Sequence, residues 1–531
     1  MKINKFTSLF ATCLLMGLTA CSNDNVSDAD SSNSAKDKDL TGKTSFSITS
    51  EAKTRTSGVY NSGVDFYWTP NDNIWVNSGS TTSPTLTASS SNNITSTTTS
   101  AKFYFDGTYT AASYPVRYTG NASTSGNTVT IATSQNQDEA NNATQLGTVG
   151  DCGVGTATRQ TDGSYKFNLS HKASYITFMP YYSKEPLDAS AVVTQIKVEA
   201  ANGEKLAGTF NFDDSGLGAA NSSSNSVTLT LNGTNPKTGF PIPTTATASK
   251  NAAIMVVAPG TYSTFKVTYT LYDSVTRTNS TISYTYSDIK CNPGKNQIIK
   301  TDLGMATYTS RKTNYYMWDA KSNYWNGYES SQPLLNNAEN TNEAKSSADT
   351  RWYNTAFTDK VQTKAINSCK DAPTFEALTW YIGGGSPKLD DKTLWVFANH
   401  LYAGGIWLKK KSEISHFSST ESYTGTATWV SGKDIKFTVS NFGKPEASVR
   451  SSYFYLPALG QYKDGKLIDL GKKGYYWAST PNPVNDGDRS QPYGKVISAN
   501  CLRFATNETL NNVYVRSYYE RYVGMQVQKF E

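Results

Sequence analysis

The chain has 531 residues, of which 17% are charged and 12% aromatic, and its formal net charge is +6. This length predicts about three domains at ~100–200 residues each. The charge is small for the size and the sequence contains no long basic run, so nucleic acid is not an expected partner. The 34 Tyr residues, together with abundant Ser, Thr, Asn and Gly, favour an extracellular, mainly β protein.

The N-terminus has the pattern of a lipoprotein signal peptide over residues 1–20. Lys2 and Lys5 precede an apolar run from Phe6 to Leu18, which is shorter than the about 20 residues of a membrane-spanning helix. Leu18-Thr19-Ala20-Cys21 matches a lipobox, so we expect cleavage before Cys21 and a lipid anchor on its thiol. An ordinary signal peptide with a chance cysteine is the alternative. Residues 21–43 hold few large apolar side chains and are expected to form a disordered tether.

The stretch Thr44–Gly58 joins a strand pattern to a basic loop. Phe46 and Ile48 alternate with Ser and Thr residues, which predicts a half-buried strand. The following Lys-Thr-Arg-Thr-Ser-Gly segment predicts an exposed loop that a trypsin-like protease can cut. Arg55 is the candidate cleavage residue and Lys53 the second choice. The alternative is a basic surface loop that no protease cuts.

Many short strand patterns, separated by turn signals, follow between residues 64 and 286. Val64–Trp68 and Asn73–Val76 are two examples, on either side of a Thr-Pro-Asn-Asp turn. Helical periodicity is not kept over three turns anywhere in this region. The pattern favours two β-sandwiches, at residues 44–170 and 171–303, rather than a β-α-β sheet.

A series of short motifs runs through residues 44–303 in a fixed order: Phe46–Ile48, Thr54-Arg55-Thr56, Trp68–Val76, Tyr114-Pro115, Leu169–Ala173, Ile196–Gly208 and Pro293–Asn296. This order resembles the fimbrillins, the pilins of type V pili. Asn71 departs from the Gly that is usual in the family's strand pair after the hinge.

The resemblance implies a mechanism for the stretch around Arg55. A lipoprotein precursor reaches the surface of a gram-negative bacterium, a protease cuts after the hinge Arg, and the first strand leaves its sandwich. A strand from a neighbouring pilus subunit then fills the open groove by donor-strand exchange, a form of β-augmentation. The expected partners are therefore other pilus subunits and, through the precursor's lipid, the outer membrane.

Residues 304–531 are predicted to form a separate domain, because eight of the ten Trp residues lie in them. A short helix is expected from Pro373 to Ile382, since Phe375, Leu378 and Ile382 are spaced as on one helix face. Gly383-Gly384-Gly385 is expected to end this helix. Trp477 lies in a strand pattern and is expected to be buried.

Four further motifs lie within Cys369–Met525: Ala372–Leu378, Tyr453–Gly460, Gly474–Pro481 and Asn512–Arg516. Together they resemble the major paralogous domain of secreted bacterial proteins, a relative of the C-type-lectin-like fold. Ala372 departs from the usual Leu, and residues 394–440 are an insertion that the motifs do not cover. The resemblance implies an α+β adhesive domain that recognises a glycan or protein of a host or bacterial surface.

No metal or cofactor is expected. The loop Pro481–Asp488 holds closely spaced oxygens that would suit Ca²⁺, but it lacks the tripeptides of calcium-dependent sugar sites, so a solvated loop is favoured. The three His residues lie well apart in the sequence, and the four cysteines expected in the exported chain have no metal-ligand spacing. These cysteines are Cys152, Cys291, Cys369 and Cys501.

Four thiols permit three disulfide pairings. We expect Cys369 and Cys501 to be structural, and a disulfide that joins the helix start to a late strand is one option. The sequence shows no paired carboxylate motif, Ser-centred elbow or phosphate-binding pattern, so an enzyme is not expected.

The sequence thus predicts a mainly β chain with two pilin-like sandwiches and an α+β, C-type-lectin-like domain. The expected function is a pilus subunit, placed at the tip, that mediates attachment to a glycan or protein. A surface-anchored glycan-binding lipoprotein that never polymerises is the alternative, and an enzyme acting on surface glycans is the third hypothesis.

Overall fold

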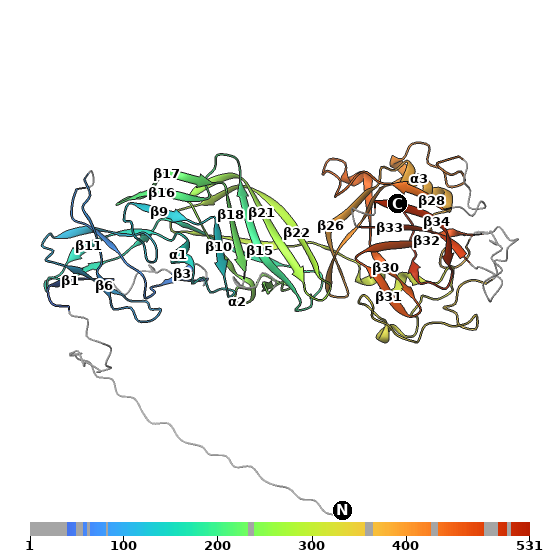
Figure 1. The fold of residues 1–531 in the computed structure, drawn as a ribbon, viewed down its shortest axis with the longest axis horizontal. Helices are drawn as coiled ribbons and strands as arrows, with labels where there is room; N and C mark the ends of the chain where they lie inside the picture. Colours follow the sequence, from blue (N-terminus) through green and yellow to red (C-terminus); the bar gives the residue numbers. More distant parts are fainter. Residues whose placement is uncertain are drawn as a thin grey trace, which may run out of the picture. The chain divides into compact units, whose positions relative to one another are not determined.

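The computed structural model describes residues 40–48, 57–60, 64–80, 83–231, 238–355, 365–425, 434–482, 498–506 and 511–531. Internal contacts divide the chain into Met1–Gly42 and Lys43–Glu531, and the second unit holds the helices and strands discussed below (Figure 1). Strands dominate the described residues, which confirms the prediction of a mainly β protein. Among these residues no helix has the length and apolar character that a membrane crossing requires.

The first sheet has nine strands, in the order β5-β4-β8-β11-β12-β1-β7-β6, with β13 beside β11. Its side chains pack into an aromatic-rich core that includes Phe46, Trp68, Phe103 and Tyr165. The strands are β1 (Lys43–Ile48), β4 (Trp75–Asn77), β5 (Leu86–Ala88), β6 (Ser91–Asn92), β7 (Lys102–Asp106), β8 (Ser113–Tyr118), β11 (Gly153–Arg159), β12 (Tyr165–Phe167) and β13 (Ser170–His171).

A separate two-stranded sheet pairs β2 (Ser57–Tyr60) with β3 (Val64–Tyr67). The predicted strands at 64–68 and 73–76 are both present, as β3 and β4, but they do not pair with each other. β4 instead joins the first sheet, between β5 and β8. The side chains of Val64 and Phe66 on β3 point into the core of the strands that follow.

The second group of strands forms three sheets, whose orders are β10-β18-β15-β21-β22 with β19 beside β15, β20-β14-β23, and β17-β16-β9. One large apolar core lies among them. The strands are β9 (Thr128–Ile131), β10 (Ser134–Gln137), β14 (Ser174–Tyr181), β15 (Ala191–Ala200), β16 (Ala207–Asp213), β17 (Gly216–Ser224), β18 (Ser226–Leu231), β19 (Phe240–Pro241), β20 (Ala253–Val257), β21 (Gly260–Asp273), β22 (Thr278–Cys291) and β23 (Asn296–Asp302).

The two groups of strands are interleaved in sequence. β9 pairs with β16 and β10 pairs with β18, and the short helix α1 (Leu146–Val149) follows before β11 returns to the first sheet. A second short helix, α2 (Ala248–Asn251), precedes β20. The chain therefore passes from the first group to the second and back before residue 170, where the sequence suggested a single boundary.

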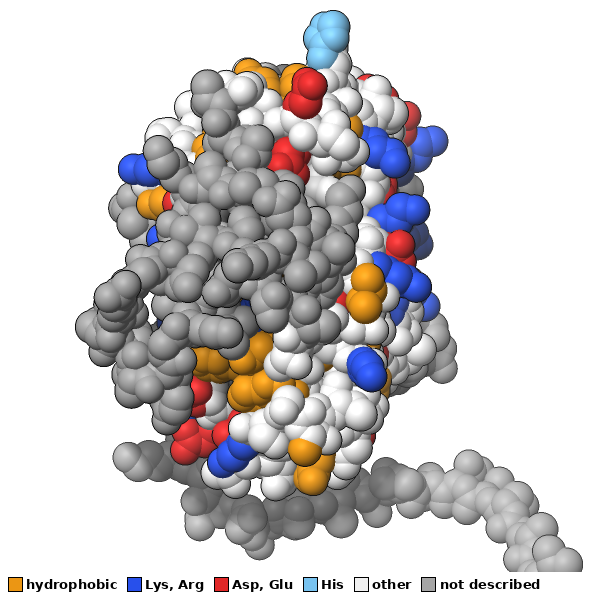
Figure 2. All heavy atoms as spheres, turned by 90° about the vertical axis from the view of Figure 1, so that its right-hand side faces the viewer, with side chains coloured by type: hydrophobic (Ala, Val, Ile, Leu, Met, Phe, Trp, Pro, Cys, Tyr) orange, Lys and Arg blue, Asp and Glu red, His pale blue; other side chains and the backbone are white. Residues whose placement is uncertain are grey.

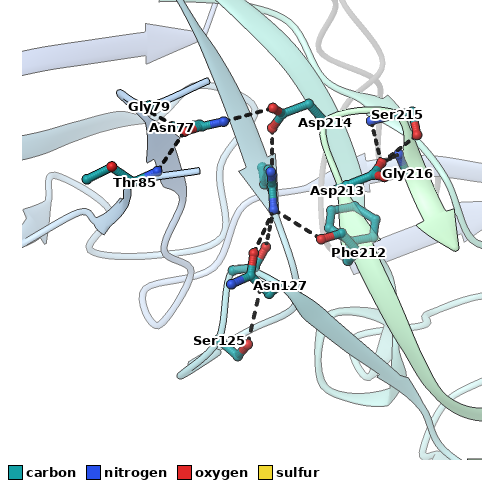
Figure 3. Close-up of polar contacts among 12 residues, drawn as sticks. Asn77, Gly79, Thr85, Ser125, Asn127, Phe212, Asp213, Asp214, Ser215 and Gly216 are labelled. Carbon is teal, nitrogen blue, oxygen red and sulfur yellow. Dashed lines mark hydrogen bonds and ion pairs between the residues drawn. The ribbon is translucent and has the colours of Figure 1, made fainter. Parts of the chain in front are cut away.

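A buried ion pair joins the first sheet to the second group (Figure 3). Arg117 of β8 donates from Nε to Oδ1 of Asp214, at 2.6 Å, and Asp214 lies in the turn between β16 and β17. Nη1 of Arg117 donates to the carbonyl oxygens of Gly126 and Phe212, both at 3.0 Å. Asn77 of β4 donates to the second oxygen of Asp214. This network couples the first sheet, and the site described below, to the rest of the protein.

The C-terminal region has a four-stranded sheet in the order β24-β26-β27-β29 and a larger sheet in the order β25-β35-β32-β33-β34-β28, to which β30 and β31 attach. The strands are β24 (Ala306–Thr307), β25 (Tyr315–Tyr316), β26 (Lys388–Phe397), β27 (His400–Lys409), β28 (Ile435–Thr438), β29 (Tyr453–Pro457), β30 (Leu459–Lys463), β31 (Lys466–Leu470), β32 (Lys473–Pro481), β33 (Ser498–Ala505), β34 (Asn512–Glu520) and β35 (Met525–Gln526).

The helix predicted in this region is present as α3 (Phe375–Gly383). The Thr374 hydroxyl caps its start by accepting a hydrogen bond from the Ala377 backbone N–H, which satisfies one of the free donors of the first turn. The buried face of α3 packs with β27, β32 and β34 into one core. Trp477 is buried, as predicted. Figure 2 shows one face of this region, where basic side chains gather along one edge with acidic side chains between them.

Candidate functional site

The candidate site is the slot that β1 occupies in the first sheet. β1 is an internal strand, because it pairs in parallel with β12 on one side and antiparallel with β7 on the other. Phe46 lies opposite Tyr165 of β12 and opposite Phe103 of β7. β12 and β7 do not pair with each other, so β1 alone closes the sheet at this point.

Aromatic side chains line the slot where β1 inserts Phe46. The Phe46 ring is fully buried and stacks on Tyr165, with centroids 4.5 Å apart and planes within 8°. Edge-to-face contacts with Phe105 and Tyr109 follow, at 4.8 and 5.4 Å between centroids. Ile48 is 9% exposed and enters the same core. The predicted alternation of β1 is therefore confirmed, and burial of these two side chains contributes about 2 kcal/mol each.

Polar contacts at the start of β1 are exposed and add less. Lys43 donates from Nζ to Asp106 at 2.6 Å and to the Ser90 hydroxyl at 2.8 Å. The hydrogen bond from Lys43 lowers the pKa of the Asp106 carboxyl. The Thr44 hydroxyl donates to the carbonyl oxygen of Gly107 at 2.8 Å. Exposed ion pairs contribute little, so the ladder hydrogen bonds and the buried side chains are what hold β1.

The segment after β1 leads to a different sheet. β1 ends at Ile48, and the next described residue, Ser57, begins β2, which pairs with β3. The two predicted processing residues, Cys21 and Arg55, lie outside the described residues, as does Lys53. A cut after Arg55 would leave β2 in the body of the protein. β1 would then be held in its slot by noncovalent contacts alone.

Departure of β1 would create a groove with two unpaired strand edges. The backbone N–H and C=O groups of β7 and β12 that now face β1 would lose their partners, and the aromatic core beneath would open to water. Both losses cost free energy until another strand replaces β1. The slot therefore has the chemistry of a binding site for an extended chain with apolar residues at alternate positions.

The four cysteines expected in the exported chain are free and buried in the structure. Cys369 and Cys501 lie in one aromatic cluster with Trp318 and Trp477, and both are free thiols, so the structure does not contain the disulfide that was one option for them. The Cys369 sulfur instead accepts a hydrogen bond from the Asp319 backbone N–H at 3.2 Å. Burial raises the pKa of both thiols, which keeps them protonated.

The described part of the chain contains no cluster of three or more side chains suited to a metal ion. Sequence reasoning also missed two sets of residues. The partners of β1, such as Phe105 and Tyr165, carry no signal of their own because they lie far from it in sequence. The second set lines a cleft around Trp407, described below, whose residues come from segments far apart in the sequence.

The comparison with known proteins finds similar solved structures at low identity. No family model and no curated protein matches the chain. A structure assigned to cell adhesion from Bacteroides uniformis is similar at 12% identity and a TM-score of 0.30, covering 49% of this chain and 93% of that one. A fimbrial assembly protein from Parabacteroides distasonis is similar at 10% identity and a TM-score of 0.23, covering 49% and 90%. At such scores the function has to be argued from the geometry of the slot.

Proposed function

We propose that this chain is the precursor of a pilus subunit, in which β1 is a removable plug over an assembly groove. The observation that carries the proposal is the position of β1, an internal strand that is also the first strand of the described residues. Because no strand precedes β1 among those residues, a single cut in the chain after β1 separates it from all the other strands. An internal strand elsewhere in the chain lacks this property.

In the proposed sequence of events, lipid on Cys21 holds the precursor in the outer membrane and a protease cuts after Arg55. β1 then leaves with the residues before it. A strand of a neighbouring subunit enters between β7 and β12, where it pairs with both edges and places apolar side chains where Phe46 and Ile48 were. The exchange is favourable when the incoming strand is longer or better matched than β1.

We further propose that the subunit lies at the pilus tip. Residues 304–531 follow β23, the last strand of the second group, and form a large region with its own cores. In this proposal the region that follows β23 takes the place of a strand that a stalk subunit would donate to the next subunit. The subunit would accept a strand through the β1 slot and present the C-terminal region, proposed to be C-type-lectin-like, to a surface glycan or protein.

The experiment that tests this function is N-terminal mass spectrometry of the chain extracted from assembled pili. We expect the N-terminus at Thr56, and Arg55→Ala should stop both processing and incorporation. Lys53→Ala is the matched control, because it removes a neighbouring basic residue and should be processed normally. Normal assembly of Arg55→Ala with an intact N-terminal segment would instead favour a surface lipoprotein that does not polymerise in this way.

A further inference from the structure

A cleft lies at the junction between the second group of strands and the C-terminal region. Its volume is about 710 Å³, within the range of small-molecule sites. The walls come from residues 281–283 of β22, from the connection 304–308, from β26 and β27, and from the loop 443–450. β22 and β26 lie side by side at this junction (Figure 1). Ligand sites occur preferentially at such domain junctions.

Hydrogen bonds fix the two walls of this cleft to each other. Asp273, at the end of β21, accepts from the Leu401 backbone N–H and from His400 Nδ1, both at 3.0 Å. The Thr276 hydroxyl donates to the Leu401 carbonyl oxygen at 2.7 Å, and the Ser280 hydroxyl donates to that of Lys392 at 2.7 Å. The cleft is therefore formed before any ligand arrives, which lowers the entropy cost of binding.

One side of the cleft is an oriented aromatic surface. Trp407 is half-buried, and its Nε1 donates to Asp390 Oδ2 at 2.8 Å. The Trp407 ring also packs on Tyr455, with centroids 4.7 Å apart. These two contacts hold the indole in one orientation. A flat apolar face of this kind suits the C–H face of a sugar ring, while the hydroxyls of Thr281 and Thr393 lie among the other lining groups.

The charge of the cleft is positive. Lys392, Lys444 and Arg450 line it, and Asp390 is the acidic residue among the lining groups. Asp390 is 2% exposed and is already occupied, since its Oδ1 accepts from two backbone N–H groups and its Oδ2 from Thr393 and Trp407.

None of the three cations forms an ion pair within the described residues. Arg450 donates from Nε and Nη2 to the Pro445 carbonyl oxygen, at 3.1 and 3.0 Å, so its charge is not neutralised. Partial desolvation, with Arg450 close by, lowers the pKa of Lys444. Three cations against the one carboxylate of Asp390 leave the lining with a net positive charge, which favours an anionic ligand in this partly desolvated cleft.

We propose that this cleft binds an acidic carbohydrate, with the ring of a sugar on Trp407 and its carboxylate at Lys444 and Arg450. The inference rests on the adhesive role proposed above and names the class of its ligand. A carbohydrate is favoured over an acidic peptide because it combines a flat apolar face, several hydroxyls and a carboxylate within one unit. Uronic acids and sialic acids both combine these groups, and they are the two possible sources of the ligand that the test distinguishes.

The test is calorimetric titration of the purified full-length chain with tetragalacturonate and with sialyllactose. The methyl ester of tetragalacturonate and lactose are the neutral counterparts. We expect saturable binding of at least one acidic sugar and none of its neutral counterpart, and the acid that binds identifies the source. Lys444→Gln and Arg450→Gln should each weaken binding by about ten-fold or more, as expected for loss of a charged hydrogen bond.

The matched control is Lys436→Gln on β28, which removes one exposed positive charge of the same region outside the cleft. Binding by this variant should equal that of the wild type. Absence of binding at about 1 mM of either acidic sugar, equal binding by the Lys444 and Arg450 variants, or equal binding of tetraglutamate would overturn the proposal. Pilus incorporation does not depend on this ligand, so the Arg55 experiment can succeed or fail independently.

Discussion

Replacement of Phe46 by Ala should loosen β1 selectively in the uncut precursor. Phe46 is fully buried, stacks on Tyr165 and contacts Phe105 and Tyr109 through ring edges. Truncation of a buried Phe costs about 3–5 kcal/mol, from lost burial and from the cavity that remains. If β1 leaves its slot as a unit, the full cost falls on that local opening. Each 1.36 kcal/mol changes the equilibrium constant for opening ten-fold, so the population in which β1 has left its slot should rise by at least about 100-fold.

The assay is native-state hydrogen exchange of the precursor. In Phe46→Ala, the amides of β7 and β12 that bond to β1 should exchange at least about 100-fold faster, because local opening exposes them. Amides in the long β21–β22 ladder should be unchanged. Ser45→Ala is the control, since that side chain is only half-buried. Equal acceleration in both regions would refute the reasoning, because β1 would then unfold only with the whole protein.

Three further predictions concern the rest of the chain. The native protein should resist thiol alkylation until it is denatured, as judged by mass spectrometry, because Cys152, Cys291, Cys369 and Cys501 are all buried. The hydrogen bond to Asp273 raises the pKa of His400, so the stability that this pair contributes is present below the ordinary His pKa and is lost as the pH rises through the raised value. Thermal unfolding should therefore separate wild type from His400→Gln at about pH 5 and much less at about pH 9. Arg117→Met should destabilise the precursor by about 3–5 kcal/mol in urea unfolding, because it leaves Asp214 as an unpaired charge, whereas an exposed Lys436→Met should have little effect.

The local features of the site could be predicted from the sequence. The alternation of Phe46 and Ile48 with polar residues predicted β1, and the spacing of Phe375, Leu378 and Ile382 predicted α3. Both signals are contained within one helix or one strand, where side-chain periodicity follows directly from backbone geometry. The burial of Trp477 was predictable for the same reason, since it lies inside an apolar strand.

The long-range features could not be predicted. Nothing near Phe46 indicates that Tyr165 and Phe103 will be its neighbours, because strand pairing is decided by packing across the whole sheet. The pairing of β9 with β16 and of β10 with β18, which places both strands in the second group, could not be predicted for the same reason. The cleft forms because Trp407 and Lys444 lie close to β22 in the folded chain, and no spacing in the sequence indicates that they do.

The most direct test of the account is a reversible lock on β1. Ser45 of β1 lies opposite Tyr104 of β7, and opposite residues of antiparallel strands have Cα atoms about 4.5–5.5 Å apart, which suits a disulfide. In Ser45→Cys/Tyr104→Cys, the oxidised chain should be cut at Arg55 yet fail to enter pili, and reduction should restore incorporation. Single Ser45→Cys should assemble under both conditions. Normal assembly of the oxidised double variant would contradict the claim that β1 must leave its slot.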